Sequence, residues 1–310
     1  ALSNTNCTQT NATTVTCTLQ INGTEGTGDI RISAQDTAGN TSTYTEAGYQ
    51  IDTTAPTVTV NTSPGQASPT NINSASFTIV FSEPGSGFTE ASMLLQGTSG
   101  SVTSLTTVDN RTFIAIITGM TSGDTVSTSL AADVAHDAAG NTTLASTSTG
   151  NSVTYDTAAP VVTVNPVLVN SASPALSGTI SDPAAIVRVS ISGITYTATN
   201  NGDGTWNLAA NAIIPALTDG AYDIIVTAED QAGNIGTDTT LDELTIDTVP
   251  PTGSVATIAP STNASPALSG VVDEPTTLVF VTVNGTRYPA MNNGDGTWSL
   301  AAGTISPALN

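Results

Sequence analysis

Residues 222–234, YDIIVTAEDQAGN, join a run of alternating residues to a tight-turn motif. Apolar side chains stand at positions 222, 224, 226 and 228, and the positions between them hold Asp, Ile, Thr and Glu. A period of two is typical of a half-buried β-strand. The Gly-Asn pair at the end suits a turn whose backbone takes a positive φ. We therefore expect a strand that ends in a tight turn.

This turn motif recurs, and a second motif follows each copy. The pattern D-x-A-G-N occurs at 36–40, 137–141 and 230–234, and after 16 to 19 residues comes the Asp of a boundary motif, IDTTAP at 51–56, YDTAAP at 155–160 and IDTVPP at 246–251. The boundary aspartates, at 52, 156 and 247, are 104 and 91 residues apart. An immunoglobulin-like sandwich has about 100 residues. The spacing therefore predicts domains of this size in tandem.

The composition agrees with strands rather than helices. Only 9% of the residues are charged and 4% are aromatic, and Thr and Val, which suit pleated strands, are abundant. We predict an all-β fold of tandem immunoglobulin-like β-sandwich domains in an extended array. The predicted domains are 1–52, the C-terminal half of a domain; 53–156 and 157–247, both complete; and 248–310, the N-terminal part of a domain.

The two partial domains leave two interpretations open. In the first, the ends of this piece cut a longer chain. In the second, the C-terminal half of one copy pairs with the N-terminal half of the next, so that complementing halves build an extracellular filament.

The last two domains match closely. SPALSG at 173–178 returns at 265–270, and NNGDGTW at 200–206 returns at 292–298. Trp206 and Trp298 are predicted to cover the sandwich core, with ligand stacking as the alternative. In the third domain we expect strands at 161–165, 174–180, 186–192, 194–199, 205–210, 221–229 and 238–246.

The charge of the chain excludes some partners. There are 25 acidic residues against four Arg and no Lys, a formal charge of −21. Such a polyanion repels nucleic acid and anionic membrane, so neither is an expected partner. No apolar run is long enough to insert into a bilayer. The carboxylates have few protein counter-charges, which points to cations.

The two cysteines lie within one predicted hairpin. Cys7 and Cys17 flank the segment TQTNATTVT, whose centre would place them opposite each other on neighbouring strands. We predict a Cys7–Cys17 disulfide, which indicates an oxidising compartment. Two free thiols are the alternative.

These motifs resemble the bacterial Ig-like repeats of giant surface adhesins, including the biofilm-associated and type I-secreted classes. The resemblance is carried by the DTTAP-type linkers, the D-x-A-G-N turns, and FSEP at 81–84 with Gly87-Phe88. It covers essentially the whole chain and is specific for the repeat class. It implies an extracellular or cell-surface location and a long stalk that holds an adhesive tip away from the cell. Several members of this class are stiffened by Ca²⁺ at domain junctions.

No enzymatic site is expected. The single histidine, His136, assembles no recognisable triad, and no phosphate loop or zinc spacing is present. We therefore predict that the chain is not an enzyme. A carbohydrate- or receptor-binding module is a further alternative, although binding faces usually carry aromatic anchors and aromatics are few here. The expected partners are neighbouring Ig-like domains of the same chain or of adjacent copies; the host or matrix ligand is not indicated.

The topology of the sandwich gathers acidic residues at each junction. A domain's N-terminus lies at the same end as its second–third strand loop and its last hairpin turn. The predicted metal ligands are Asp52 with Glu83, Asp137 and Asn141; Asp156 with Asp182, Asp230 and Asn234; Asp247 with Asp273 or Glu274; and Asp36 with Asn40. Such oxygens repel one another without a cation, and Ca²⁺ takes about six to eight oxygen ligands. We therefore expect structural Ca²⁺ at the junctions.

The alternative assigns these residues a local role. An Asp at the start of a turn can accept hydrogen bonds from its own backbone, and Gly-Asn supplies the left-handed geometry. In that case each D-x-A-G-N is only a capped turn.

Overall fold

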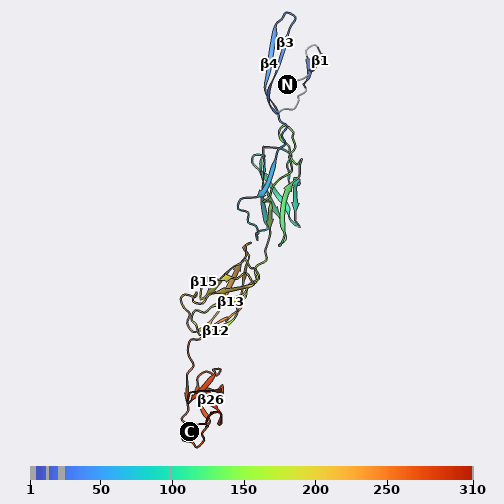
Figure 1. Cartoon of the computed structure of the whole chain (residues 1–310). Coiled ribbons are helices and arrows are strands. Elements are labelled where there is room, and N and C mark those ends of the chain that lie inside the picture. Colours follow the sequence, from blue (N-terminus) through green and yellow to red (C-terminus); the bar gives the residue numbers. More distant parts are fainter. Residues whose placement is uncertain (1–4, 12–13, 20–24, 98, 309–310) are drawn as a thin grey trace.

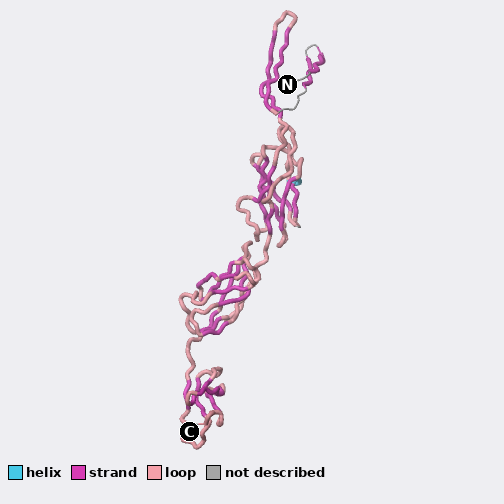
Figure 2. Tube along the Cα trace, in the orientation of Figure 1, coloured by secondary structure: helices cyan, strands magenta, loops and turns pink. Residues whose placement is uncertain are grey.

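A computed structural model describes residues 5–11, 14–19, 25–97 and 99–308, with side chains from residue 25 onward. The chain is a row of β-units along an elongated path (Figures 1 and 2). The all-β prediction is confirmed, since the one helical element described is a 3-10 turn, η1, at Glu90–Ser92. No helix among these residues is long and apolar enough to cross a membrane. We name the units first (5–51), second (58–155), third (162–246) and fourth (253–308).

The first unit consists of two hairpins. Strand β1 (Thr5–Asn11) pairs with β2 (Thr14–Leu19), and β3 (Gly26–Gln35) pairs with β4 (Thr41–Ile51), each antiparallel. Within β3 and β4 every side chain is exposed except Ile30 and Ile51, which are half-buried. This long hairpin thus stands without a core around it in the described part of the chain.

The β1–β2 pairing sets Cys7 directly opposite Cys17. Their side chains lie outside the described residues, so the disulfide stays a prediction. We expect the denatured, unreduced protein to take up no alkylating reagent and the reduced protein to take up two adducts, because the chain has two cysteines. Intact-mass spectrometry reads both values. Two adducts without reduction would show free thiols instead.

The second unit is a two-sheet sandwich. One sheet has the order β5-β6-β9-β8 and the other β11-β10-β7. Its strands are β5 (Val58–Thr62), β6 (Ser74–Phe81), β7 (Met93–Gln96), β8 (Ser101–Thr107), β9 (Thr112–Thr118), β10 (Thr125–Leu130) and β11 (Ser152–Thr154). Strand β6 alternates buried and half-buried residues, so Ala75, Phe77, Ile79 and Phe81 face the core between the sheets. The apolar residues at every second position of β6 therefore form its buried face.

The third unit has its own core and three sheets, ordered β15-β14-β19-β20, β12-β21-β18 and β13-β17-β16. Its strands are β12 (Val167–Val169), β13 (Leu176–Thr179), β14 (Ile186–Ile191), β15 (Ile194–Thr197), β16 (Thr199–Asn200), β17 (Thr205–Leu208), β18 (Gly220–Tyr222), β19 (Ile224–Glu229), β20 (Ile235–Thr237) and β21 (Leu244–Ile246).

Three of the expected strands of this unit are wrong in detail, and one of them, 221–229, is divided at Asp223 into β18 and β19, which lie in different sheets. The segment 161–165 forms no strand and contributes one isolated bridge, Val162 to Ile180. The segment 238–246 holds only β21, since the strand after the turn is β20, which pairs with β19, whereas β21 lies in the opposite sheet beside β12 and β18. The chain thus changes sheets within the expected strand, and this lets it cover both sides of the core.

Trp206 fills the centre of the third unit, as predicted. It is fully buried on β17 opposite Gly178 of β13, and its indole Nε1 donates a hydrogen bond of 2.8 Å to the Thr163 carbonyl oxygen. A Cβ on Gly178 would lie 2.6 Å from that Nε1. Glycine is therefore required for the ring to lie flat across the strand.

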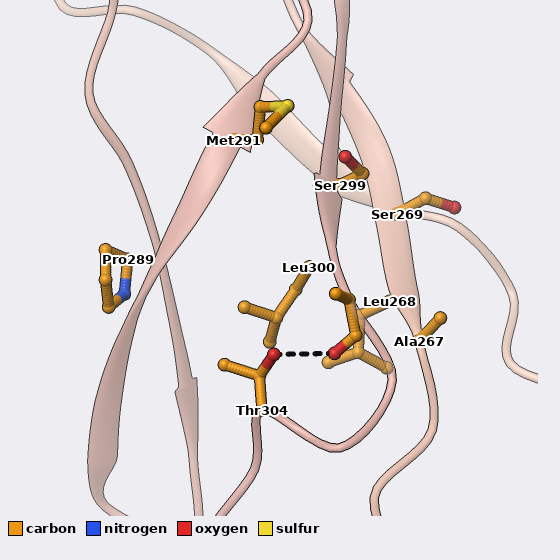
Figure 3. Close-up of a pocket in the computed structure, with 9 residues that line it drawn as sticks. Ala267, Leu268, Ser269, Pro289, Met291, Ser299, Leu300 and Thr304 are labelled. Atoms are coloured by element: carbon orange, nitrogen blue, oxygen red, sulfur yellow. Dashed lines mark hydrogen bonds between the residues drawn. The ribbon is translucent and has the colours of Figure 1, made fainter.

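The fourth unit contains a single described sheet, ordered β22-β23-β26-β25-β24. Its strands are β22 (Gly253–Val255), β23 (Leu268–Val272), β24 (Val279–Val283), β25 (Thr286–Asn292) and β26 (Thr297–Leu300). Trp298 repeats the role of Trp206, with Nε1 3.0 Å from the Ser254 carbonyl oxygen. The fourth unit has an open hollow of about 430 Å³, which is bordered by Leu300, Thr304 and Pro289 among others (Figure 3). Beside it, Thr304 Oγ1 donates a hydrogen bond to the Ala301 carbonyl oxygen.

Candidate metal centre

The D-x-A-G-N turns are capped by their own aspartates. In the second unit, Asp137 Oδ1 accepts hydrogen bonds from the backbone N–H groups of Ala139 and Asn141, both at 2.9 Å. Asn141 Nδ2 donates to Asp137 Oδ2 at 2.8 Å, and Gly140 has a φ of 92°. The turns that begin at Asp36 and Asp230 make the same Asp–Asn contacts. The local role proposed for these turns is thus present in all three.

The asparagine of the turn also binds the linker that enters the unit. Asn141 Nδ2 donates to the Asp52 carbonyl oxygen at 3.0 Å. Asn234 Nδ2 donates to the Asp156 carbonyl oxygen at 2.9 Å. One side chain therefore fastens the turn to the boundary motif, at both the first–second and the second–third junction.

Three carboxylates meet at the first–second junction. Asp52, Glu83 and Asp137 each have an oxygen within 4.8 Å of the others, which is the grouping that the sequence predicted. Asp137 is only 3% exposed and Glu83 is half-buried. Both Nδ2 hydrogens of Asn141 are donated, so its carbonyl oxygen is the atom left for a cation.

No arginine whose side chain is described forms a salt bridge with this group. Among the residues with described side chains, the one salt bridge joins Arg188 to Glu229, in the third unit. The side-chain hydrogen bond from Asn141 holds the pKa of Asp137 below its ordinary value. Asp137 therefore stays ionised at neutral pH. An all-oxygen donor set of this charge fits a hard cation such as Ca²⁺.

The loop that carries Glu83 is fastened beside the turn. Ser86 and His136 exchange two backbone hydrogen bonds, and Ser86 Oγ shares another with His136 Nε2 at 3.0 Å. A Cβ on Gly85 would lie 2.9 Å from the His136 carbonyl oxygen. This contact was not predicted; the signal for it in the sequence is the S-E-P-G-S-G run at 82–87, whose glycines allow the loop to lie against the strand end before Asp137.

The second–third junction does not form such a group among the described residues. Asp156 Oδ1 accepts from the Ala158 N–H at 2.9 Å, as Asp52 Oδ1 does from the Thr54 N–H at 3.0 Å, but here Asp182 Oδ1 also accepts from its own loop, from the Ala184 N–H at 2.8 Å. Burial raises the pKa of Asp230, but the hydrogen bonds from Asn234 hold it lower overall. Asp182 is one methylene shorter than Glu83 and caps its own loop, so it does not reach the other two.

The remaining predicted ligands are also occupied locally. Asp273 accepts from Thr252 N–H at 2.8 Å and Thr252 Oγ1 at 2.7 Å, Glu274 Oε2 accepts from Thr277 Oγ1, and Asp247 Oδ1 accepts from the Val249 N–H. Asp36 and Asn40 lie at the exposed tip of the β3–β4 hairpin. Of the predicted sets that hold more than one carboxylate, the described structure therefore brings one together, at the first–second junction.

Two family models described as bacterial Ig-like domains match the chain, one over residues 52–165 and the other over 162–248. Similar solved structures include invasin, described as a bacterial integrin-binding protein (14% identity, 96% of this chain, 63% of that chain, TM-score 0.42). They also include Yersinia pseudotuberculosis InvD (15% identity, 70% of this chain, 69% of that chain, TM-score 0.32). Titin domains A168–A170 are a third similar structure (11% identity, 70% of this chain, 75% of that chain, TM-score 0.33). No curated protein sequence matches. The chain thus spans 63% of the length of the invasin structure.

Proposed function

Residues 52–248 are two bacterial Ig-like domains in tandem, and from this we propose that the chain is a structural segment of the stalk of a bacterial cell-surface adhesin. The proposal includes an extracellular location and no enzymatic role. Its partners are neighbouring units of the same chain. The observation that carries it is the arrangement of separate cores in an elongated row (Figure 1). Such a row separates its two ends, which is the mechanical task of a stalk.

The junctions support a load-bearing role. A flexible linker would let each unit swing freely, but here Asn141 and Asn234 each bind a linker carbonyl oxygen. A hydrogen bond of this kind contributes only about 0.5–1.5 kcal/mol. The direct contact alone therefore limits the hinge weakly, and a further constraint would stiffen it.

We propose that Ca²⁺ supplies this constraint at the first–second junction. Asp52 comes from the linker, Glu83 from the loop after β6, and Asp137 from the turn, so one cation would join three segments. Extracellular modules bind Ca²⁺ with dissociation constants of roughly 10⁻⁴–10⁻³ M. A site of that affinity would be occupied outside a cell and empty inside it.

Small-angle scattering of the whole chain tests both parts. We expect an elongated particle in millimolar Ca²⁺ and a shorter, more broadly distributed one after chelation, because the first–second hinge is released. Glu83→Gln should abolish the response to chelation. Asp182→Asn removes the equivalent charge at the second–third junction and should leave the response intact.

The two parts of the proposal fail in different ways. A compact particle under all conditions would contradict the stalk. An elongated particle that is unaffected by chelation would retain the stalk and remove calcium from it.

A further inference from the structure

The turn between β16 and β17 contains an asparagine that is followed by a glycine. Asn201 and Gly202 are both exposed, and the residues that contact them lie within the third unit. In such a pair the backbone nitrogen of the glycine can attack the side-chain amide of the asparagine, because glycine has no side chain to hinder the approach. The turn therefore holds a nucleophile and an electrophile on adjacent residues.

The reaction between them is a deamidation. A bond forms between Gly202 N and Asn201 Cγ, and the bond from Cγ to Nδ2 breaks. The amide nitrogen leaves as ammonia, which takes the proton of the Gly202 N–H. Water then opens the cyclic imide at either carbonyl and leaves an aspartate or an isoaspartate at position 201. The isoaspartate carries the Cβ methylene within the backbone, so the chain becomes longer at the turn.

The folded turn occupies the attacking nitrogen. The Gly202 N–H donates a hydrogen bond of 3.1 Å to Oδ1 of Asn200, the residue before the reactive asparagine. The Asn200 side chain is itself anchored, since its Nδ2 donates to the Asp182 and Ala185 carbonyl oxygens, both at 2.9 Å. The Gly202 N–H is thus directed at a fixed side chain, and attack on Asn201 requires this contact to break.

The amide under attack is held as well. Asn201 Nδ2 donates to Thr205 Oγ1 at 2.9 Å, and the Asn201 N–H donates to the Thr205 carbonyl oxygen at 3.0 Å. Thr205 Oγ1 in turn donates to Asp203 Oδ1 at 2.6 Å. Ring closure needs Asn201 Cγ to rotate toward Gly202 N, so it must also break the contact across the hairpin.

We propose that Asn201 is a deamidation site that the folded turn holds inactive, and that Asn200 restrains the attacking nitrogen. The site becomes reactive when the turn opens. Asn200 lies opposite Trp206 in the β16–β17 pair, and Trp206 is fully buried. An isoaspartate at position 201 therefore lengthens the backbone beside the central side chain of this core. The inference is independent of the stalk and of calcium.

Substitutions at Asn200 separate the local contact from the folded state as a whole. Asn200→Ala removes the acceptor of the Gly202 N–H and both Nδ2 donors. Asn200→Asp loses the same donors but keeps an acceptor oxygen. It destabilises the unit at least as much, because a carboxylate oxygen then faces two carbonyl oxygens. Asn165→Ala is the matched control, since Asn165 Nδ2 donates to Ser177 Oγ, away from this turn.

A further variant acts on the other reactant. Thr205→Val removes the acceptor of Asn201 Nδ2 and leaves Asn200 unchanged. Thr205 is exposed, so the change leaves the core intact. Hydrogen exchange in peptides that cover β14 and β19 shows which variants stay folded, and only folded variants are compared. Thr205→Val decides the test if a substitution at Asn200 unfolds the unit.

Peptide mass spectrometry measures the reaction on the whole chain during incubation at mildly alkaline pH, and fragment ions assign it to Asn201. We expect slow deamidation in wild type and Asn165→Ala, and fast deamidation of wild type in urea. Asn200→Ala and Thr205→Val should each react about tenfold faster than wild type, which corresponds to one lost hydrogen bond. Asn200→Asp should stay near the wild-type rate.

Three results would each overturn the proposal. One is a native wild type that deamidates at Asn201 as fast as the chain in urea, since the turn would then restrain nothing. Another is the wild-type rate in every folded variant that lacks one of the two acceptors. The third is a folded Asn200→Asp variant as fast as Asn200→Ala, because the contact to Gly202 would then give no protection.

Discussion

Replacing Trp206 by alanine is expected to lower the free energy of unfolding of the third unit by about 3–5 kcal/mol. The side chain is fully buried among the residues of that core. Its loss leaves a cavity and takes the indole N–H away from the Thr163 carbonyl. The free energy of unfolding of a domain is only about 5–15 kcal/mol, so this change removes a large part of it.

Hydrogen exchange measured by mass spectrometry locates the effect. Peptides from residues 162–246 should lose protection, while peptides from residues 58–155 keep it, because the two cores are separate. Trp298→Ala is the matched control and should act on the fourth unit alone. Equal loss of protection in the second and third units would show that the units do not unfold independently.

Much of this fold follows from local patterns. The alternation at 222–229 predicts buried side chains because strand residues alternate between two faces, and Ile224, Val226 and Ala228 are indeed buried. Trp206 is predictable as a core residue because a large aromatic side chain between tight turns has little other favourable environment. The repeats add the order of the units, since each copy supplies its own turn and boundary.

The sheet that each strand joins could not be predicted as well from the sequence. The sequence of residues 238–246 resembles that of one strand. Where the chain passes from one sheet to the other depends on which partner strands are nearby, and the sequence of the segment does not show this. Asp223 shows the same limit, since it separates β18 in one sheet from β19 in another. Its carboxylate accepts the Asp242 N–H at 2.9 Å, a contact across 19 residues.

The candidate metal site, too, could be predicted in part from the sequence. Topology alone placed Asp52, Glu83 and Asp137 together, because chain ends and loops of a sandwich lie at predictable ends. Topology does not distinguish this junction from the second–third junction, where Asp182 caps its own loop. The difference comes from side-chain length and from local hydrogen bonds, which repeated motifs do not encode. The donor role of Asn141 was also missed, because the sequence suggested only its oxygen.

Gly236→Ala is expected to have the second large effect, at the second–third junction. Gly236 lies in β20, and a Cβ there would be 1.7 Å from the Pro160 carbonyl oxygen and 2.8 Å from its carbonyl carbon. These are backbone atoms of the last residue of the boundary motif, so neither can rotate away. Overpacking of this kind typically costs about 1–3 kcal/mol. The methyl group must push the linker off β20 or distort the strand.

The measured consequence should therefore be both a less stable third unit and a looser linker. We expect faster hydrogen exchange in peptides that cover residues 156–165, and a broader scattering-derived length distribution, with or without Ca²⁺. Gly28→Ala is the control, since its Cβ would meet nothing within 4 Å and its φ is not in the left-handed region. In the second unit Thr143 is buried at the corresponding position, two residues after Asn141. The segment after the turn meets the linker at the first–second junction too, where the Leu144 N–H donates to the Pro56 carbonyl oxygen at 3.0 Å, so it is the glycine and not the contact itself that is particular to the second–third junction. Unchanged exchange in Gly236→Ala would mean that the linker relaxes without cost, and packing against β20 would then contribute nothing to the stiffness of that junction.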